Sequence, residues 1–205
     1  MGSKPHHAPA PTMVAQVNPP VHVWVMPPTR TPRLLLRAYR PSDRREFLDR
    51  LTDASEQLAC WLPLHRPGET DDQVFERHLA ESVAAAGRCW RRAVQDDEGR
   101  LVGGVNLINI RRGMTFEADA NWWIAPEFQR RGFATEAVQA LVDIALADPP
   151  AGLGLHRVNA MITGANEPSR RLAERLGFRR LAESAACVAM GGVPVAHHLY
   201  ARTCA

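Results

Sequence analysis

Hydrophobic and polar residues follow two different periods along this chain, and the two periods separate the expected strands from the expected helices. Short apolar runs bounded by turn residues are typical of strands. Such runs predict strands over residues 34–38, 88–94, 101–110, 115–124 and 156–162, with two further strands after residue 177. The run from Asp96 to Gly99 predicts a turn between two of them. The strands therefore begin as a meander of sequential neighbours.

Four segments have the features of helices. They are expected from Ser42 toward Leu51, from residue 71 or 72 to 86, after residue 132, and over 168–176. The third is the clearest, because Ala137, Leu141, Ile144 and Ala145 share one helical face. Helices that alternate with strands after an initial meander predict an α/β or α+β fold, in which helices are layered on one sheet.

The first thirty residues differ in composition from the rest. Half of the 16 prolines lie in the first 32 residues. Proline fixes φ and removes a hydrogen-bond donor, so residues 1–30 are expected to form an extended or flexible arm. The run from Val21 to Met26 is apolar enough to dock on the domain, and both docking and disorder stay open. Residues 31–205 are expected to form a single domain.

Charge and cysteine placement exclude several classes of protein. A formal net charge of +3 over 205 residues does not give the strongly basic face of a dedicated nucleic-acid binder. The cysteines are scattered, with no histidine at ligand spacing, which argues against a disulfide framework and against a metal site. No apolar run is long enough to span a bilayer, and the first residues lack the pattern of a secretory signal. We therefore expect a cytoplasmic protein without metal, membrane contact or direct nucleic-acid binding.

The segment from Ile124 to Ala137 is the most informative part of the sequence. A strand ends, a loop with two adjacent arginines follows, and a helix begins just after Gly132. Backbone N–H groups in the first turn of a helix have no internal partner, and the helix dipole adds positive potential there. Gly132 and Ala134 let an anion approach the backbone closely, which predicts a phosphate site. Strand–glycine–helix junctions also occur without a ligand, so this loop alone decides nothing.

Other phosphate-binding and catalytic signatures are missing from the chain. It contains no G-x-x-x-x-G-K-[ST], G-x-G-x-x-G, G-x-S-x-G or H-E-x-x-H sequence. Gln129-x-x-Gly132-x-Ala134 instead resembles the Q/R-x-x-G-x-G/A pyrophosphate loop of the GNAT acyltransferase superfamily. Further segments resemble its ribosomal-protein N-terminal acetyltransferase (Rim-type) branch in the same order: Thr31–Arg37 with Asp43, Leu155–Val158, Asn166–Ser169 and Leu176–Phe178.

The resemblance implies a fold and a cosubstrate. The fold would be a mixed, mainly antiparallel sheet of about six to seven strands, flanked by about four helices, with its fourth and fifth strands splayed apart. Acetyl-coenzyme A (acetyl-CoA) would lie in the gap, its pyrophosphate on the loop and its pantetheine along the exposed strand edge. The implied cofactor-binding residues are Trp123, Ile124, Gln129, Arg130, Arg131, Gly132, Phe133, Ala134 and Asn166.

Transfer to an amine requires that the amine lose a proton, which a carboxylate in the cleft can take. Alternation along the strand puts Glu117 and Asp119 on one face with Asn121 and Trp123, and we expect this polar face to meet the cleft. The resemblance favours Asp119, which stands where many relatives have Glu. A solvated or arginine-paired role for both acids stays open.

Two further residues are candidates on the resemblance alone. Ser169 would lie near the thiol and protonate the leaving thiolate, beside the helix cap that Asn166 is suited to form. Trp61 resembles a tryptophan on the acceptor side, although a Trp beside Leu and Pro is often part of a core.

The expected function is direct transfer of acetyl from acetyl-CoA to a primary amine, without metal or a covalent enzyme intermediate. The resemblance favours a protein N-terminal α-amine, including that of a ribosomal protein. A small amine or antibiotic acceptor is the alternative enzyme, and a non-catalytic acyl-CoA sensor is the alternative from another class. The fold cannot decide among them.

Overall fold

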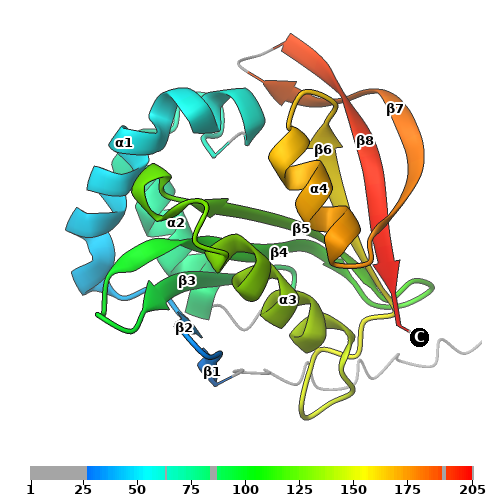
Figure 1. The fold of residues 1–205 in the computed structure, drawn as a ribbon, viewed down its shortest axis with the longest axis horizontal. Coiled ribbons are helices and arrows are strands. Elements are labelled where there is room, and N and C mark those ends of the chain that lie inside the picture. Colours follow the sequence, from blue (N-terminus) through cyan, green and yellow to red (C-terminus); the bar gives the residue numbers. More distant parts are fainter. Residues whose placement is uncertain (1–26, 63, 84–86, 191–192, 205) are drawn as a thin grey trace, which may run out of the picture.

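One eight-stranded sheet with helices on both faces forms the described part of the protein (Figure 1). The computed structural model describes residues 27–62, 64–83, 87–190 and 193–204, with the backbone alone at 57, 59, 184–187 and 189. In chain order the elements are β1 (Thr29–Arg30), β2 (Leu34–Arg37), α1 (Arg44–Trp61), α2 (Asp71–Val83), β3 (Trp90–Asp96), β4 (Leu101–Arg111), β5 (Glu117–Ile124), α3 (Phe133–Leu146), β6 (Arg157–Thr163), α4 (Glu167–Arg175), β7 (Arg179–Met190) and β8 (Val193–Thr203). The predicted class of fold is confirmed.

Two details differ from the expectation. The sheet has eight strands instead of six or seven, because Thr29 and Arg30 form a short strand that pairs with β2. These two residues were assigned to the arm, whereas residues 1–26, including the run from Val21 to Met26, lie outside the described residues. Helix α1 continues ten residues past Leu51, because Leu51, Ala54 and Leu58 extend its apolar stripe at helical spacing.

The order of the strands creates a gap in the sheet. It is β1-β2-β3-β4-β5-β6-β8-β7, and every neighbouring pair is antiparallel except β5 and β6. The parallel pair is registered only from Glu117 opposite Arg157 to Asp119 opposite Asn159. Among the described strands, the later residues of β5 therefore pair with β4 alone. Leaving the two-residue β1 uncounted, these are the fourth and fifth strands that were expected to splay.

Helices cover the two faces of the sheet and bring their ends to this gap. Helix α3 packs on β2, β4, β5 and β6 with a buried stripe that includes Ala137, Leu141 and Ala145. On the opposite face, Phe47 of α1 packs edge-on against Trp123 of β5, with ring centroids 5.9 Å apart. Figure 1 shows α3 and α4 in front of the sheet and α2 behind it. In the described part of the chain, no helix has both the length and the apolar character needed to cross a bilayer.

A buried ion pair fixes the start of the domain. Arg37 donates from Nη1 to Oδ2 of Asp43 at 2.7 Å and from Nη2 to Oδ1 at 2.8 Å. Both side chains are buried, and such a two-bond arginine–carboxylate contact is strong and directional. It ties β2 to the turn that precedes α1, which explains the last arginine of the Thr31–Arg37 segment.

Candidate functional site

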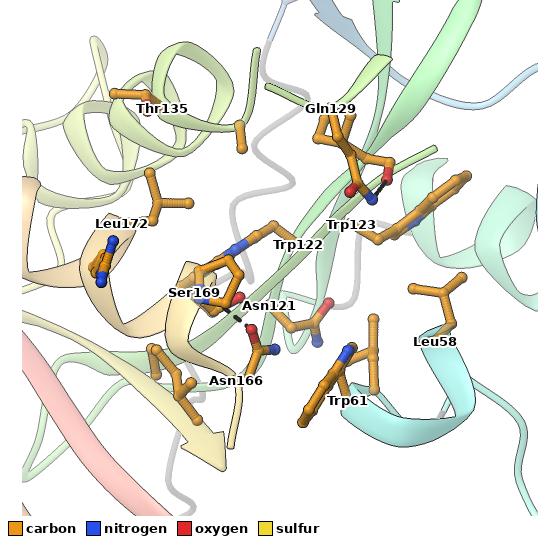
Figure 2. Close-up of a pocket in the computed structure, with 18 of the residues that line it drawn as sticks. Leu58, Trp61, Asn121, Trp122, Trp123, Gln129, Thr135, Asn166, Ser169 and Leu172 are labelled. Carbon is orange, nitrogen blue, oxygen red and sulfur yellow. Dashed lines mark hydrogen bonds between the residues drawn. The ribbon is translucent and has the colours of Figure 1, made fainter. Parts of the chain in front are cut away.

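A cavity of about 820 Å³ opens where β5 and β6 separate. Figure 2 shows Asn121 and Trp122 between residues of α4 on one side and Leu58 and Trp61 of α1 on the other. The described lining residues come from α1 with its C-cap (Leu58, Trp61, Leu62), β5 (Ala120–Ile124), the following loop (Phe128, Gln129, Arg130, Gly132), α3 (Ala134, Thr135), β6 (Ala160–Ile162) and α4 with its N-cap (Asn166, Pro168, Ser169, Arg171, Leu172, Arg175). The cavity is large enough for a ligand of cofactor size.

The loop before α3 has the geometry of an anion site. Gly132 is the N-cap of α3 and has a left-handed backbone, with φ 80° and ψ 0°. The first helical hydrogen bond runs from the Glu136 N–H to the Gly132 carbonyl at 3.1 Å. The amides of residues 133–135 come before this first helical donor and have no acceptor within the helix, and the helix dipole makes this end positive. These donors are the chemical match for a phosphate.

The space at Gly132 also fits a bound anion. A Cβ at this position would lie 3.2 Å from Nη2 of Arg33, and apart from the adjoining backbone it would meet no other atom of the described residues within 4 Å. Among the described lining residues, the charged side chains are all arginines: Arg130, Arg171 and Arg175. A small residue, helix amides and positive charge together suit a pyrophosphate group.

Gln129 fixes the loop to the strand that precedes it. Its Nε2 donates to the carbonyl of Ile124 at 2.9 Å. Ile124 and Trp123 line the cavity at the end of β5, although the Trp123 ring is buried under α1. The expected cofactor-binding positions at 123, 124 and 129 therefore meet in one wall.

Arg131 and Phe133 are placed differently from the other residues of the loop. Neither is among the lining residues. The Arg131 guanidinium lies over the Phe128 ring at 5.5 Å, and Phe133 is buried beneath the guanidinium of Arg33 at 4.9 Å. If either residue contacts a ligand in the cavity, it must do so through its main chain.

The start of α4, which follows β6 in the chain, also lines the cavity. The Oδ1 of Asn166 accepts a hydrogen bond from the Ser169 N–H at 3.1 Å, which is the expected N-cap. Both residues line the cavity. The cap uses the amide oxygen of Asn166 and leaves its amide N–H groups as donors, so capping and ligand binding are compatible.

Trp61 ends α1 at the far wall of the cavity. It is half-buried, and Leu58 and Leu62 line the same wall. The helix stops there, with the Leu62 N–H bonded to the Leu58 carbonyl at 2.8 Å. The structure thus brings Trp61 into the same cavity as Gly132 and Asn166, which are more than sixty residues away in sequence.

The two expected carboxylates are not among the lining residues. Of the polar strand face, Asn121 and Trp123 reach the cavity, whereas Glu117 and Asp119 lie where β5 and β6 are still paired. The expectation that the whole face meets the cleft is therefore corrected. The alternation along the strand was right, but the gap opens only after residue 119 because the parallel register extends that far.

Arginines and amides surround both carboxylates. Glu117 is buried and accepts from Arg111 Nε at 3.0 Å and from Arg157 Nε at 2.7 Å. Burial alone would raise the pKa of this carboxyl, but hydrogen bonds from Asn159 and the two arginines outweigh it and hold the pKa below its usual value. The Asp119 side chain is 27% exposed and accepts from Asn109 Nδ2 at 2.9 Å.

Sequence reasoning missed several residues of the site. Trp122 of β5 and Leu172 of α4 line the cavity, and Asn106 of β4 donates from Nδ2 to Oδ1 of Asn121 at 2.7 Å. Trp122 alternates with the polar residues of its strand, and alternation alone does not reveal a gap beside the strand. The Asn106 contact depends on the register of β4 and β5 across 15 residues, which no local pattern indicates.

Known proteins resemble this chain in sequence and in fold. The sequence profile of the Acetyltransferase (GNAT) domain matches residues 33–179. The Bacillus subtilis protein named "Putative ribosomal N-acetyltransferase YdaF" is 26% identical over 154 residues, covering 71% of this chain and 77% of that protein. The structure of Mycobacterium smegmatis RimJ in complex with CoA-disulfide superposes with a TM-score of 0.74 at 22% identity, covering 83% and 81% of the two chains. Ribosomal-protein-S5-alanine acetyltransferase from Vibrio fischeri gives 0.74 at 21% identity, covering 87% and 97%.

These findings agree with the segments on which the resemblance was based. The profile match spans well over half of the chain and includes the loop at Gly132 and the cap at Asn166. The fold has the splayed strands that the resemblance implied. The chain therefore belongs to the GNAT family of acetyltransferases, which use acetyl-CoA as the acyl donor.

Proposed function

We propose that this enzyme acetylates the α-amine at the N-terminus of a protein, including that of a ribosomal protein. The observation that carries the proposal is a single cavity with an anion-binding loop at Gly132 and an aromatic wall at Trp61, joined by the unpaired edge of β5. This arrangement gives the acyl donor and the amine separate approaches to the same strand edge.

The donor would be held by main-chain groups of the loop and of β5. The loop amides up to residue 134 would bind the pyrophosphate, with charge from Arg130, which lines the cavity, whereas Arg131 would contribute its main chain. Beyond Asp119, one edge of β5 has lost its strand partner, so its N–H and C=O groups can pair with the amides of pantetheine. When bound, acetyl-CoA supplies a thioester, which is an acyl group activated for attack by an amine.

An α-amine is the acceptor that needs the least help from this cavity. Its pKa is about 8, whereas that of a lysine is about 10.4, so on the order of a tenth of α-amines but fewer than about one lysine in a thousand is uncharged at neutral pH. The ionisable side chains among the described lining residues are arginines, which stay protonated and cannot take a proton. The names of YdaF and of the Vibrio fischeri enzyme support the same class of acceptor.

Three side chains complete the proposed mechanism. Asp119 would take the amine proton through a water molecule, because it is more exposed than Glu117 and lies two residues before the lining residue Asn121. Ser169 would donate a proton to the departing thiolate. Trp61 would contact the acceptor from the end of α1. The reaction is then a direct transfer, in which the amine nitrogen bonds to the acetyl carbon as the carbon–sulfur bond breaks.

Release of free thiol from acetyl-CoA tests the acceptor. We expect turnover with peptides that have a free N-terminus and no turnover with the same peptides blocked by N-terminal acetylation, even when they contain lysine. Polyamines and aminoglycosides serve as the small-amine comparison. A higher kcat/KM with one of these than with every peptide would contradict the peptide proposal. Binding of coenzyme A without release of free thiol for any amine would instead indicate a non-catalytic acyl-CoA sensor.

Asn166 allows its two roles to be separated by two substitutions. Asn166→Asp keeps the oxygen that caps α4 but removes the amide donors, so we expect unchanged thermal stability and a roughly tenfold higher Kd for coenzyme A, the cost of one hydrogen bond to a buried ligand. Asn166→Ala also removes the cap and is expected to lose about 1 kcal/mol of stability. Calorimetry and thermal unfolding measure the two effects. Equal Kd values for Asn166→Asp and the wild type would restrict Asn166 to capping.

A further inference from the structure

The segment between β1 and β2 holds a carboxylate in the first turn of α3. Glu136 accepts from Thr31 Oγ1 at 2.6 Å and from the Arg33 main-chain N–H at 2.8 Å, both on Oε1. Its Oε2 accepts from Arg33 Nε at 2.8 Å and Nη2 at 2.7 Å. Four donors from two residues thus converge on one carboxylate, about a hundred positions away in sequence.

The Arg33 side chain that binds this carboxylate also contacts the loop before α3. Its Nη1 donates to the carbonyl of Arg131 at 2.8 Å, and its guanidinium lies 4.9 Å from the centre of the Phe133 ring. Its Nη2 is also the nearest atom to the position of a Cβ on Gly132. Arg33 itself is not among the lining residues. Its guanidinium therefore supports the loop from outside the cavity.

The bond to Arg131 determines which way the next amide points. The peptide joining Arg131 to Gly132 is trans, because the one cis peptide in the described residues is Pro149–Pro150. In a planar trans peptide the C=O and N–H bonds point in opposite directions. Holding the Arg131 carbonyl toward Arg33 turns the Gly132 N–H away from Arg33. Because Gly132 lines the cavity, we expect this amide to act as a donor together with those at the start of α3.

Arg33 also removes an electrostatic obstacle to anion binding. A carboxylate in the first turn of a helix occupies the positive end of the helix dipole, where a phosphate would bind. Burial raises the pKa of Glu136, but hydrogen bonds from Thr31 and Arg33 outweigh it and keep the pKa below its usual value. The carboxylate is thus charged, and the Arg33 guanidinium compensates it.

We infer that Arg33, held by Glu136 and Thr31, is a positioning residue that orients the 131–132 peptide and neutralises Glu136 so that the loop can bind a pyrophosphate. This inference rests on the proposed binding of the acetyl-CoA pyrophosphate by this loop. Arg33 acts through the loop and touches neither the acyl group nor the amine.

Calorimetry with coenzyme A, and KM values for acetyl-CoA and acetyl-pantetheine, test this role. For Arg33→Ala we expect about a tenfold higher Kd for coenzyme A and a similar rise in KM for acetyl-CoA, with kcat little changed. The KM for acetyl-pantetheine, which lacks the pyrophosphate, is expected to stay within about twofold. Arg33→Lys keeps the charge but cannot bridge Glu136 and Arg131 together, so its Kd should lie between those of the wild type and Arg33→Ala.

Arg30→Ala is the matched control, because Arg30 is an exposed arginine on the adjoining strand. It should leave every value unchanged. A general loss of structure in Arg33→Ala would raise the KM for both donors, and that result, or an unchanged Kd, would overturn the inference. A second variant, Gly132→Val, distinguishes failure of this inference from failure of the proposed pyrophosphate site on which it rests. If Gly132→Val loses coenzyme A while Arg33→Ala does not, only the role of Arg33 fails; if neither loses it, the loop assignment fails.

Discussion

Replacing Gly132 with valine is expected to raise the Kd for coenzyme A by roughly 100-fold or more. The side chain would enter the space that an anion needs in order to reach the amides of α3, and its Cβ would lie 3.2 Å from the Arg33 guanidinium that supports the loop. Gly132 also has φ 80°, a conformation that a β-branched residue rarely adopts. The substitution therefore acts both on the space and on the direction of the loop amides.

Gly68→Val is the control for backbone strain. Gly68 has φ 78°, and a Cβ there would meet nothing within 4 Å. Both variants should lose about 1–2 kcal/mol of stability from the left-handed conformation, or a few degrees in the midpoint of thermal unfolding. Only Gly132→Val should lose binding in calorimetry. Equal affinity in the two variants would remove the phosphate site from this loop.

The geometry of the loop before α3 could be predicted from sequence because its physics is local. A strand end, a glycine and the start of a helix follow one another within Ile124–Ala137, and each has its own sequence signal. The structure adds Arg33 and Glu136, whose contact joins segments that no periodic pattern relates. Arg33 belongs to a segment that supported the resemblance, yet a family pattern does not by itself say which group an arginine contacts.

The strand that carries Asp119 shows what a local sequence pattern could not predict. Alternation correctly placed Glu117, Asp119, Asn121 and Trp123 on one side of β5. It could not tell where along the strand the cavity begins, because that point depends on the register between β5 and β6, which are about forty residues apart. The same long-range pairing brings Arg157 to Glu117, so that an expected cleft residue is instead a buried carboxylate bound by a partly exposed arginine.

Asp119→Asn is expected to lower kcat roughly 100-fold, the low end for loss of a general base, while the Kd for coenzyme A stays unchanged. The substitution keeps the shape of the side chain and replaces the basic carboxylate that would accept the proton with an amide, which is not basic. Water can reach Asp119, which is 27% exposed, although Asn109 donates to its Oδ2 and both Asn159 and Arg111 donate to its Oδ1. The loss should shrink as the pH rises, because the free amine and hydroxide then replace the base. Rates across about pH 6 to 9, which brackets the pKa of an α-amine, measure this dependence.

Glu117→Gln is the matched comparison, one step away on the same strand face. Glu117 is held by two arginines, so we expect its replacement to act on stability and to leave the pH profile of kcat unchanged. Because folding lowers the pKa of Glu117, its contribution to stability is present at neutral pH and is lost as the pH falls through the folded-state pKa. The difference in unfolding midpoint between wild type and Glu117→Gln should therefore disappear in acid. If Asp119→Asn instead keeps the wild-type rate across the whole pH range, Asp119 has the same supporting role as Glu117, and water alone takes the proton of the α-amine.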